Sequence, residues 1–400
     1  MPLDLSSVYE AKERLKGVIT KTPLSRSQSL SELCGCEIYL KKENLQTTGA
    51  FKIRGAYNKI ASLEPQKREC GVIAASAGNH AQGVALSAVM FGIKAVIVMP
   101  VSTPITKIDG VKSHGAEVIL SGANYDEAYA FALKYAQKHS LTFVHPFEDE
   151  LVMAGQGTLA LELLECCEDL DAVVVPAGGG GLVSGVATVI KALSPSTEVI
   201  AVSAKGAPAL KNSYDAKSAQ DTLQVRTIAD GIAVRDTSSV TLGYILKNVD
   251  HFVSVDDAEI ASAMLYLLES QKLVVEGAGA VGVAALMHGK LEHLSGKKVA
   301  IVLSGGNVDV TLLSVIIEKG LLKSGRKMNL TVTLIDKPGS LMMLTEILRD
   351  LNANIVQISY DRTAISLDYG DANVTLSLET KGLEHQDEIL SKLREHGYIR

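Results

Sequence analysis

The sequence predicts an α/β protein with parallel sheets, followed by a smaller α+β unit at its C-terminus. From about residue 37 to 320, short runs with strand character alternate with helical patterns. Several of these runs are almost continuously apolar, as is typical of strands buried on both faces of a parallel sheet. After Gly320 the order of elements changes to most of a ferredoxin-like βαββαβ unit.

Composition favours a protein that acts on small molecules. The chain has 400 residues, of which 47% are hydrophobic, enough for one large domain and a smaller companion. Its 39 basic and 45 acidic side chains give a net charge of -6 without long charged runs, which excludes an obvious nucleic-acid or anionic-membrane surface. The start lacks a signal-peptide pattern, and apolar runs such as residues 94–99 are shorter than a membrane span, so we expect a cytoplasmic protein.

The five cysteines form neither a CxxC pair nor a Cys/His ligand spacing. We therefore expect reduced, structural cysteines and no metal site.

Seven strands are expected in the first 320 residues, and three of them end at glycine-containing loops. The runs are EIYLKKE (37–43), GVIAAS (71–76), KAVIVMP (94–100), AEVIL (116–120), DAVVVPA (171–177), EVIAVSA (198–204) and KVAIVLS (298–304). The loops follow at residues 75–78, 177–181 and 303–306. Because open α/β sheets bind ligands at the carboxyl ends of their strands, the loops are candidate parts of one site.

The expected domains are residues 1–320, with a smaller subdomain at about 42–145 inserted in the larger one, and residues 326–400, with a polar linker at 321–325 between them. Within the second domain we expect strands at 328–335, 354–361 and 372–380 and helices at 339–350 and 383–396. Only residues 397–400 remain for a last short strand.

The segment TGAFKIRGA (48–56) contains Lys52 at an expected helix start. A lysine there is ordinarily a solvated surface residue. The functional alternative is a Schiff-base lysine, which needs an amine whose pKa is lowered by its neighbours or by desolvation.

Two further segments place a helix start after a strand. SAGNHAQG (76–83) offers unpaired backbone N–H groups that suit a carboxylate, whereas His80 by itself fits a packed or capping histidine and is not assigned catalysis. The four glycines at 178–181 can turn successive N–H groups toward a phosphate, although a flexible loop is the alternative. Neither a GxGxxG register nor a P-loop Lys-Ser/Thr pair is present there. The fourth segment, SGGN (304–307), is by itself compatible with an ordinary turn.

In this order, the four segments resemble the threonine/serine dehydratases, which are β-family pyridoxal-phosphate (PLP) enzymes. The resemblance implies a tryptophan synthase β-like fold with two parallel-sheet subdomains. The loop DKPGSL (336–341) resembles that of medium-length members that carry one C-terminal ACT domain, a ferredoxin-like regulatory module.

The resemblance also implies residue roles. Lys52 would form the Schiff base, Asn79 would contact the phenolic oxygen of PLP, and Ser304 would contact its pyridine nitrogen. The implied cofactor-binding residues are Phe51, Lys52, Asn79, Gly178, Gly179, Gly180, Gly181, Leu182 and Ser304. The implied substrate-binding residues, around the carboxylate, are Ser76, Ala77, Gly78, Asn79 and His80.

The implied reaction is β-elimination of water from L-threonine, giving 2-oxobutanoate and ammonia, and from L-serine, giving pyruvate. A neutral serine at the pyridine nitrogen supports this reaction, because it makes the ring a weaker electron sink than an aspartate would. Two departures from related enzymes stand out. Ala50 replaces a usual serine, and Ser203, Ala207 and Ala209 replace the carboxylates that bind a divalent cation in serine racemases.

Alternatives within the family are an amino-acid racemase and a β-replacement enzyme. Racemisation needs a second acid/base on the opposite face of Cα, and related racemases have a serine where this chain has Ala77. A catalytically inactive amino-acid sensor is a further alternative, which the retained Lys52 disfavours.

The C-terminal domain is expected to bind an effector, an amino acid such as isoleucine or valine, or a nucleotide. By resemblance to ACT domains, the contacts would be Gly339, Ser340 and Leu341 of one chain and Asn354 or Gln357 of its neighbour. We therefore expect a homodimer or homotetramer, and a purely dimerising role of the module is the alternative.

Overall fold

A computed structural model describes residues 2–399 and divides the chain into two compact units, one up to Val308 and one from Asp309 onward. This division comes earlier than the expected linker at 321–325. Helix α14 (Val310–Lys323) occupies most of that stretch, and the Asp309 side chain caps its start by accepting a hydrogen bond from the Thr311 N–H. The helix contacts β11, the first strand of the second unit, and therefore belongs to that unit.

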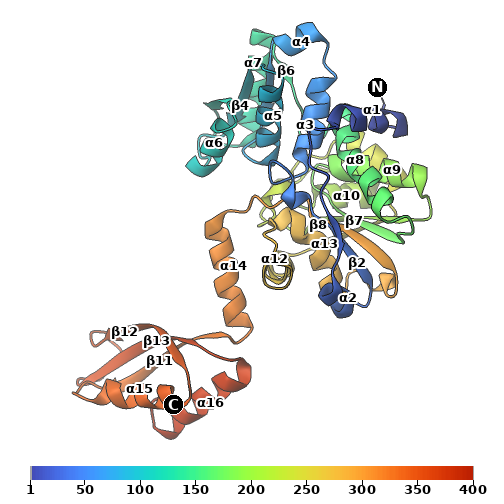
Figure 1. The fold of residues 1–400 in the computed structure, drawn as a ribbon. Helices are drawn as coiled ribbons and strands as arrows, with labels where there is room; N and C mark the ends of the chain where they lie inside the picture. The colour runs from blue at the N-terminus through green and yellow to red at the C-terminus, as the bar shows by residue number, and fades with distance from the viewer. Residues whose placement is uncertain (1, 400) are drawn as a thin grey trace. The chain divides into compact units, whose positions relative to one another are not determined.

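The first unit contains a six-stranded sheet in the order β1-β2-β10-β7-β8-β9. Its strands β2, β7 and β8 are labelled in Figure 1. Strand β1 is antiparallel to β2, and the other neighbours are parallel. The strands are β1 (Leu24–Arg26), β2 (Glu37–Lys41), β7 (Ala172–Pro176), β8 (Glu198–Ala204), β9 (His251–Val255) and β10 (Lys298–Val302). Strand β7 is buried at every position, as expected for a strand covered on both faces.

Helices cover this sheet. Helix α9 contacts β7 and β8 and packs on α8, and α13 contacts β7, β8, β9 and β10. The helices are α1 (Leu5–Leu15), α2 (Gln28–Cys34), α8 (Glu150–Cys166), α9 (Gly181–Leu193), α10 (Ala209–Ala216), α11 (Ser239–Asn248), α12 (Asp257–Gln271) and α13 (Gly277–Met287), with 3-10 turns η1 (Glu43–Leu45), η2 (Asp230–Ile232) and η3 (Glu292–Leu294).

A second, four-stranded parallel sheet of the first unit has the order β5-β4-β3-β6. Its strands are β3 (Val72–Ala75), β4 (Ala95–Met99), β5 (Glu117–Leu120) and β6 (Thr142–Phe143), and its helices are α3 (Lys52–Ala61), α4 (Pro65–Glu69), α5 (Asn79–Met90), α6 (Ile105–Lys112) and α7 (Tyr125–His139). One core cluster joins α3 and α5 to the sheet, and a separate cluster joins α7 to it. All these elements fall within residues 42–145, the range expected for the smaller subdomain.

The parallel-sheet α/β prediction is confirmed for the first unit, and all seven expected strands are present. Strands β1, β6 and β9 were not predicted, because two are very short and the third, HFVSV, contains polar residues. Within the described residues, none of the helices combines the length and apolar character that a bilayer span requires.

The second unit contains a three-stranded antiparallel sheet in the order β11-β13-β12. Its elements after α14 are β11 (Lys327–Ile335), α15 (Ser340–Asp350), β12 (Asn354–Asp361), β13 (Asp371–Glu379) and α16 (Leu383–Glu395). Alternate residues of β11 and β13, such as Val332 and Val374, share a core with Leu344 of α15 and Ile389 of α16. The fourth strand left for residues 397–400 does not form at 397–399, and Arg400 lies outside the described residues.

Candidate active site

The predicted cofactor and substrate residues line one cavity of about 920 Å³ in the first unit. The lining includes the ends of β3, β7 and β10 and the starts of α3, α5 and α9. The cavity thus lies at the carboxyl ends of parallel strands, where α/β sheets bind ligands. Its volume falls within the range typical of small-molecule sites.

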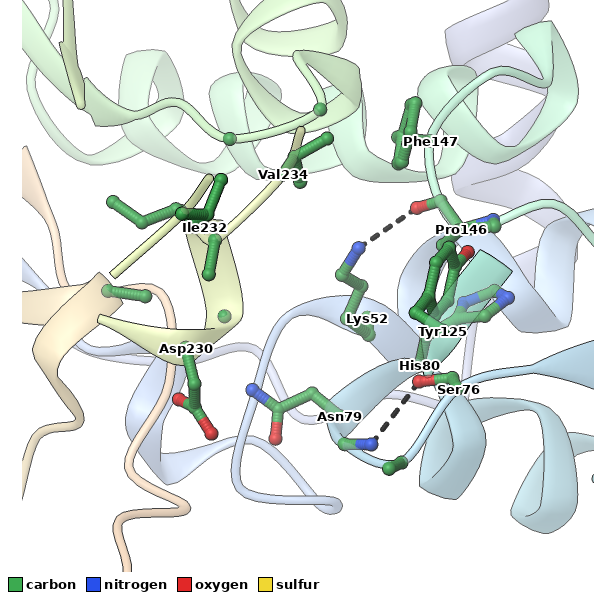
Figure 2. Close-up of a pocket in the computed structure, with 18 of the residues that line it drawn as sticks. Lys52, Ser76, Asn79, His80, Tyr125, Pro146, Phe147, Asp230, Ile232 and Val234 are labelled. Atoms are coloured by element: carbon green, nitrogen blue, oxygen red, sulfur yellow. Dashed lines mark hydrogen bonds between the residues drawn. The ribbon is translucent and has the colours of Figure 1, made fainter. Parts of the chain in front are cut away.

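Lys52 is the first residue of α3, and its side chain points into the cavity (Figure 2). Its Nζ donates a hydrogen bond to the Pro146 carbonyl oxygen at 2.9 Å. Burial lowers the pKa of Lys52 to about 8, although the nearby Glu276 opposes this shift. The amine is therefore much more readily neutral than an ordinary lysine, as a nucleophile or base requires.

Asn79, the first residue of α5, is held by two side chains from distant segments. Its Nδ2 donates to Oε1 and Oε2 of Glu276 at 2.8 and 3.0 Å, and its Oδ1 accepts from Asn307 Nδ2 at 2.8 Å. Asn307 also donates to the Thr48 carbonyl oxygen at 2.7 Å. These bonds connect the segments that contain Lys52, Asn79 and Ser304.

Glu276 was not among the predicted site residues. It is buried, and burial raises its pKa to about 7 against the opposing hydrogen bond from Asn79. A signal was present in the sequence, because Glu276 is the single charged residue in the apolar run from Leu273 to Met287. An isolated charge in such a run needs a buried partner.

The glycine loop follows β7 and leads directly into α9. Gly180 is the N-cap of α9, with φ 88°, and no side chain caps this helix. An added Cβ at Gly179 would lie 2.3 Å from the Phe147 ring, so only glycine fits there. Because the first N–H groups of a helix have no partner within it, the start of α9 is suited to an anion such as a phosphate.

Ser304 follows β10 and is buried in the cavity wall. Its carbonyl oxygen accepts a hydrogen bond from the Phe51 N–H at 3.1 Å, which fixes the start of α3 beside it. Ala50, which stands where the resembling enzymes usually have a serine, forms an isolated β-bridge with Gly305. Its buried methyl group leaves no hydroxyl at this position.

The loop from Ser76 to His80 lies at the end of β3. The Ser76 hydroxyl accepts from the Gly78 N–H at 3.2 Å, and Ala77 also lines the cavity. His80 Nε2 lies 2.8 Å from the Val144 carbonyl oxygen, and burial together with Lys52 lowers the pKa of His80 to about 3. The ring is therefore neutral, and the bond to a carbonyl requires the proton on Nε2.

Two ion pairs cross the cavity mouth from the smaller subdomain to a later loop. Lys107 of α6 lies 2.9 Å from Asp230 of η2, and Asp126 of α7 pairs with Arg235. These four residues line the cavity and were not predicted. Their pairing depends on tertiary structure, and no motif marks them.

These residues fit PLP. The cavity contains an amine with a lowered pKa, an uncapped helix start made of glycines, and a buried hydroxyl at Ser304. Lys52 would hold the aldehyde carbon, the start of α9 the phosphate, and Ser304 the ring nitrogen.

The predicted effector residues lie in the second unit. Gly339 is the N-cap of α15, which has no side-chain cap, while Ser340 is buried and Leu341 is 37% exposed. Asn354 and Gln357 lie on β12, and Asn354 donates to Glu379 at 2.8 Å.

Known proteins resemble this chain over most of its length. The family described as "Pyridoxal-phosphate dependent enzyme" matches residues 15–305. An L-threonine ammonia-lyase of Thermotoga maritima is 49% identical over 396 residues, which cover 99% of this chain and 98% of that protein.

Solved structures agree with this match. Maize serine racemase is 35% identical, with a TM-score of 0.76 over 81% of this chain and 99% of its own. The processed form of threonine deaminase isoform 2 from Solanum lycopersicum is 34% identical, with a TM-score of 0.75 over 80% of this chain and 91% of its own. From the cavity and these similarities together, we conclude that the chain belongs to the family of pyridoxal-phosphate dependent enzymes.

Proposed function

We propose that this enzyme is a lyase that eliminates water from L-threonine, that hydrolysis of the product takes the water up again and releases ammonia, and that the net result is deamination to 2-oxobutanoate. L-Serine would give pyruvate by the same route. The observation that carries the proposal is the single cavity that contains Lys52, Asn79, the glycine loop and Ser304. The 49% identity to an L-threonine ammonia-lyase over nearly the whole chain supports the choice of substrate.

PLP, when bound, withdraws electrons from the Cα of an attached amino acid and so makes its proton removable. Residues of the chain would bind the substrate and accept its proton. The backbone at the start of α5, from Gly78 to His80, suits the substrate carboxylate because its N–H groups lie at the positive end of the helix. The Lys52 amine would accept the Cα proton as the base.

The β-hydroxyl would leave with one proton as water, and hydrolysis of the resulting enamine would take up one water and release the keto acid and ammonia. The pKa of Lys52, about 8, allows the neutral amine to form near physiological pH. The neutral Ser304 hydroxyl would hold the ring nitrogen without supplying the charge that an aspartate would, which favours prompt elimination.

A coupled assay of keto-acid and ammonia release tests this proposal directly. The enzyme loaded with PLP should release equal amounts of 2-oxobutanoate and ammonia from L-threonine, and pyruvate and ammonia from L-serine. D-threonine is the matched control and should give no product. Absence of keto acid from both L-substrates would refute the assignment.

Racemisation is the second candidate, and the similarity to maize serine racemase favours it. Ala77 lines the cavity and has no group that can exchange a proton on the second face of Cα. We expect the wild type to form little D-serine and Ala77→Ser to form more relative to pyruvate, with Ala77→Gly as the control. If chiral chromatography finds no increase in D-serine relative to pyruvate for Ala77→Ser, Ala77 is not what prevents racemisation.

We further propose that residues 326–400 form an ACT module that binds an amino acid and regulates the first unit. The α15 start at Gly339 has no side-chain cap, which suits a carboxylate. The sheet order β11-β13-β12 leaves β12 at an edge, where Asn354 and Gln357 can face a second chain. The assembly would then be a homodimer or homotetramer.

Calorimetry and threonine kinetics on the full chain test this regulation with isoleucine, valine, serine, threonine and AMP. A coupling of about 1 to 3 kcal/mol is expected, which is typical of allosteric pairs. Gln357→Ala should weaken the coupling between effector binding and catalysis. Asn329→Ala, which alters an exposed residue of β11, should leave this coupling unchanged. No heat and no kinetic effect from any of these compounds would leave the module with a dimerising role.

A further inference from the structure

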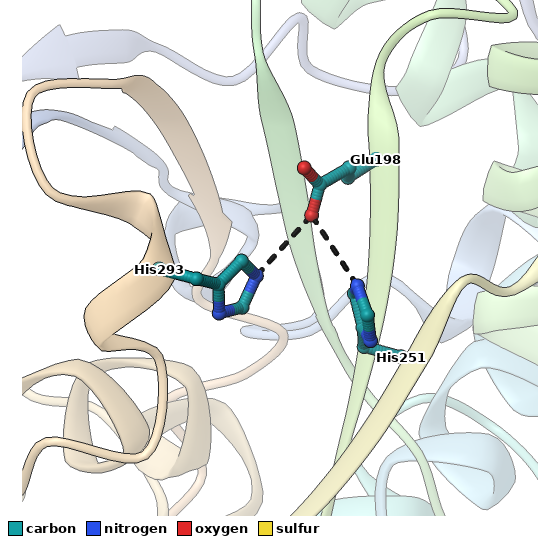
Figure 3. Close-up of side chains that lie close together, drawn as sticks. All are labelled: Glu198, His251 and His293. Carbon is teal, nitrogen blue, oxygen red and sulfur yellow. Dashed lines mark hydrogen bonds and ion pairs between the residues drawn. The ribbon is translucent and has the colours of Figure 1, made fainter.

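Glu198, His251 and His293 form a cluster of three potential metal ligands (Figure 3). Glu198 begins β8, His251 begins β9, and His293 lies in η3, shortly before β10. The active-site loops of this sheet follow the carboxyl ends of β7 and β10, whereas the cluster lies at the amino ends of the sheet's parallel strands, opposite to the active site. The function proposed above does not involve these three residues.

The backbone register brings the cluster together. His251 pairs with Ile200, two residues after Glu198, so the side chains of Glu198 and His251 leave the same face of the sheet. His293 approaches that face from η3. Glu198 Oε2 lies 3.2 Å from His293 Nε2 and 3.6 Å from His251 Nε2.

These separations match those of ligands around one small metal ion. Ligand atoms about 2.0 Å from a tetrahedral zinc ion lie about 3.3 Å from one another. All three donor atoms here lie within 4.8 Å of one another. The His251 and His293 rings meet at 59° with their centroids 5.0 Å apart, so they are not stacked face to face.

Lys297 orients the carboxylate without occupying the oxygen that faces the histidines. Its Nζ lies 2.6 Å from Glu198 Oε1, which leaves Oε2 directed at the two rings. Carboxylate ligands of metals are commonly held by such an outer hydrogen bond. Both histidines are accessible, because their side chains are 53% and 42% exposed.

We propose that Glu198, His251 and His293 bind one zinc ion or a similar borderline divalent ion, with water completing the coordination. Two imidazoles and one carboxylate favour zinc over magnesium or calcium, which prefer ligand sets made of oxygen. The ion would link β8, β9 and η3 and stabilise the sheet. Ligand spacing did not predict this site, because the three residues come from segments far apart in sequence.

Zinc titration of the full-length, PLP-loaded enzyme after treatment with a chelator tests the proposal. We expect about one zinc ion per chain by calorimetry and metal analysis, and a higher midpoint of thermal unfolding because the ion binds the folded state. Mutation of a group that only supports a metal ligand typically weakens metal binding by about 10- to 100-fold. Loss of a direct ligand in His251→Gln or His293→Gln should therefore weaken zinc binding by at least about tenfold. Both residues are surface-accessible, so these variants should fold and keep keto-acid production.

His288→Gln is the matched control, because His288 is an exposed histidine just before η3 and outside the cluster. It should bind zinc like the wild type. Cobalt(II) separates this site from the cysteines, since bound cobalt should show tetrahedral absorption without a thiolate charge-transfer band. Equal zinc affinity in the wild type, His251→Gln and His293→Gln, a thiolate band, or displacement of zinc by equimolar magnesium would overturn the proposal.

Discussion

Helix α3 carries two cations two residues apart, Lys52 and Arg54, whose surroundings differ in kind. The Arg54 guanidinium donates to Glu43 through two bonds of 2.8 Å and to Glu162 through bonds of 2.7 and 3.0 Å. Lys41, also fully buried, pairs with Glu162 as well. Lys52, in contrast, donates to the Pro146 carbonyl and has no carboxylate bonded to it among residues 2–399.

The difference determines which cation is available for chemistry. Burial by itself opposes the charged form of Arg54, but Glu43 and Glu162 overcome this effect and raise its pKa. Burial likewise opposes ionisation of Glu43, yet Arg54 holds the pKa of Glu43 below its usual value. At Lys52 burial prevails and lowers the pKa to about 8. Carboxylate partners thus keep a buried cation charged, and their absence allows it to become neutral.

Removal of Lys52, the cation without a bonded carboxylate, should have the largest effect, and that effect should be on activity. Lys52→Ala should reduce keto-acid release by at least about 10³-fold, because a positioned acid/base contributes about 10² to 10⁴ and the covalent link is lost as well. Lys42→Ala, on a residue outside the cavity, is the control and should keep activity. Borohydride reduction followed by peptide mass analysis should label Lys52 in the wild type. A reducible cofactor adduct in Lys52→Ala would contradict the assignment.

Removal of the paired cation should affect stability. Arg54→Ala leaves the fully buried Glu43 without its cation and removes one of the two cations that pair with Glu162, which should lower the free energy of unfolding by about 3 to 5 kcal/mol. Denaturant unfolding measures this change. Arg26→Ala breaks an exposed pair with Glu37 and should cost less than about 1 kcal/mol. Similar losses in the two variants would mean that burial does not set the strength of the Arg54 pairs.

The pH dependence of cofactor attachment separates two effects on the pKa of Lys52: burial, which lowers it, and Glu276, which raises it. Attachment needs the neutral amine, so its rate in the apoenzyme should rise with pH to a plateau, with a midpoint near the pKa of about 8. The pKa of Glu276 is about 7, so its carboxyl group is ionised above that pH. The ionised carboxylate raises the pKa of Lys52. Glu276→Gln should therefore move the midpoint to lower pH. Stopped-flow absorbance measures the rate, and an upward shift would reverse the assigned sign.

The exposed pair at the cavity mouth should have the smallest effect. The Lys107 and Asp230 side chains are 35% and 61% exposed, so Lys107→Gln should change the free energy of unfolding by less than about 1 kcal/mol. Its expected consequence is kinetic, because the pair joins the two sides of the cavity mouth. The KM for threonine should rise modestly and lose part of its dependence on salt. Lys94→Gln removes an exposed pair away from the cavity and should leave the KM unchanged.

The sequence predicted the parts of the cavity that are encoded locally. Lys52, Asn79 and Ser304 each stand at the end of a strand or the start of a helix, and apolar runs identify those strands without any tertiary information. The five elements between Met328 and His396 were likewise predicted to within a residue or two, because alternation and helical periodicity are strong there.

Only the tertiary structure places Glu276 beside Asn79, gathers Glu198, His251 and His293 at one sheet end, and assigns α14 to the second unit. Strand order is the physical reason. A local apolar pattern gives a strand's faces and ends, but its neighbours in the sheet depend on packing of the whole chain. Side chains that meet only across such neighbours leave no pattern of spacing in the sequence.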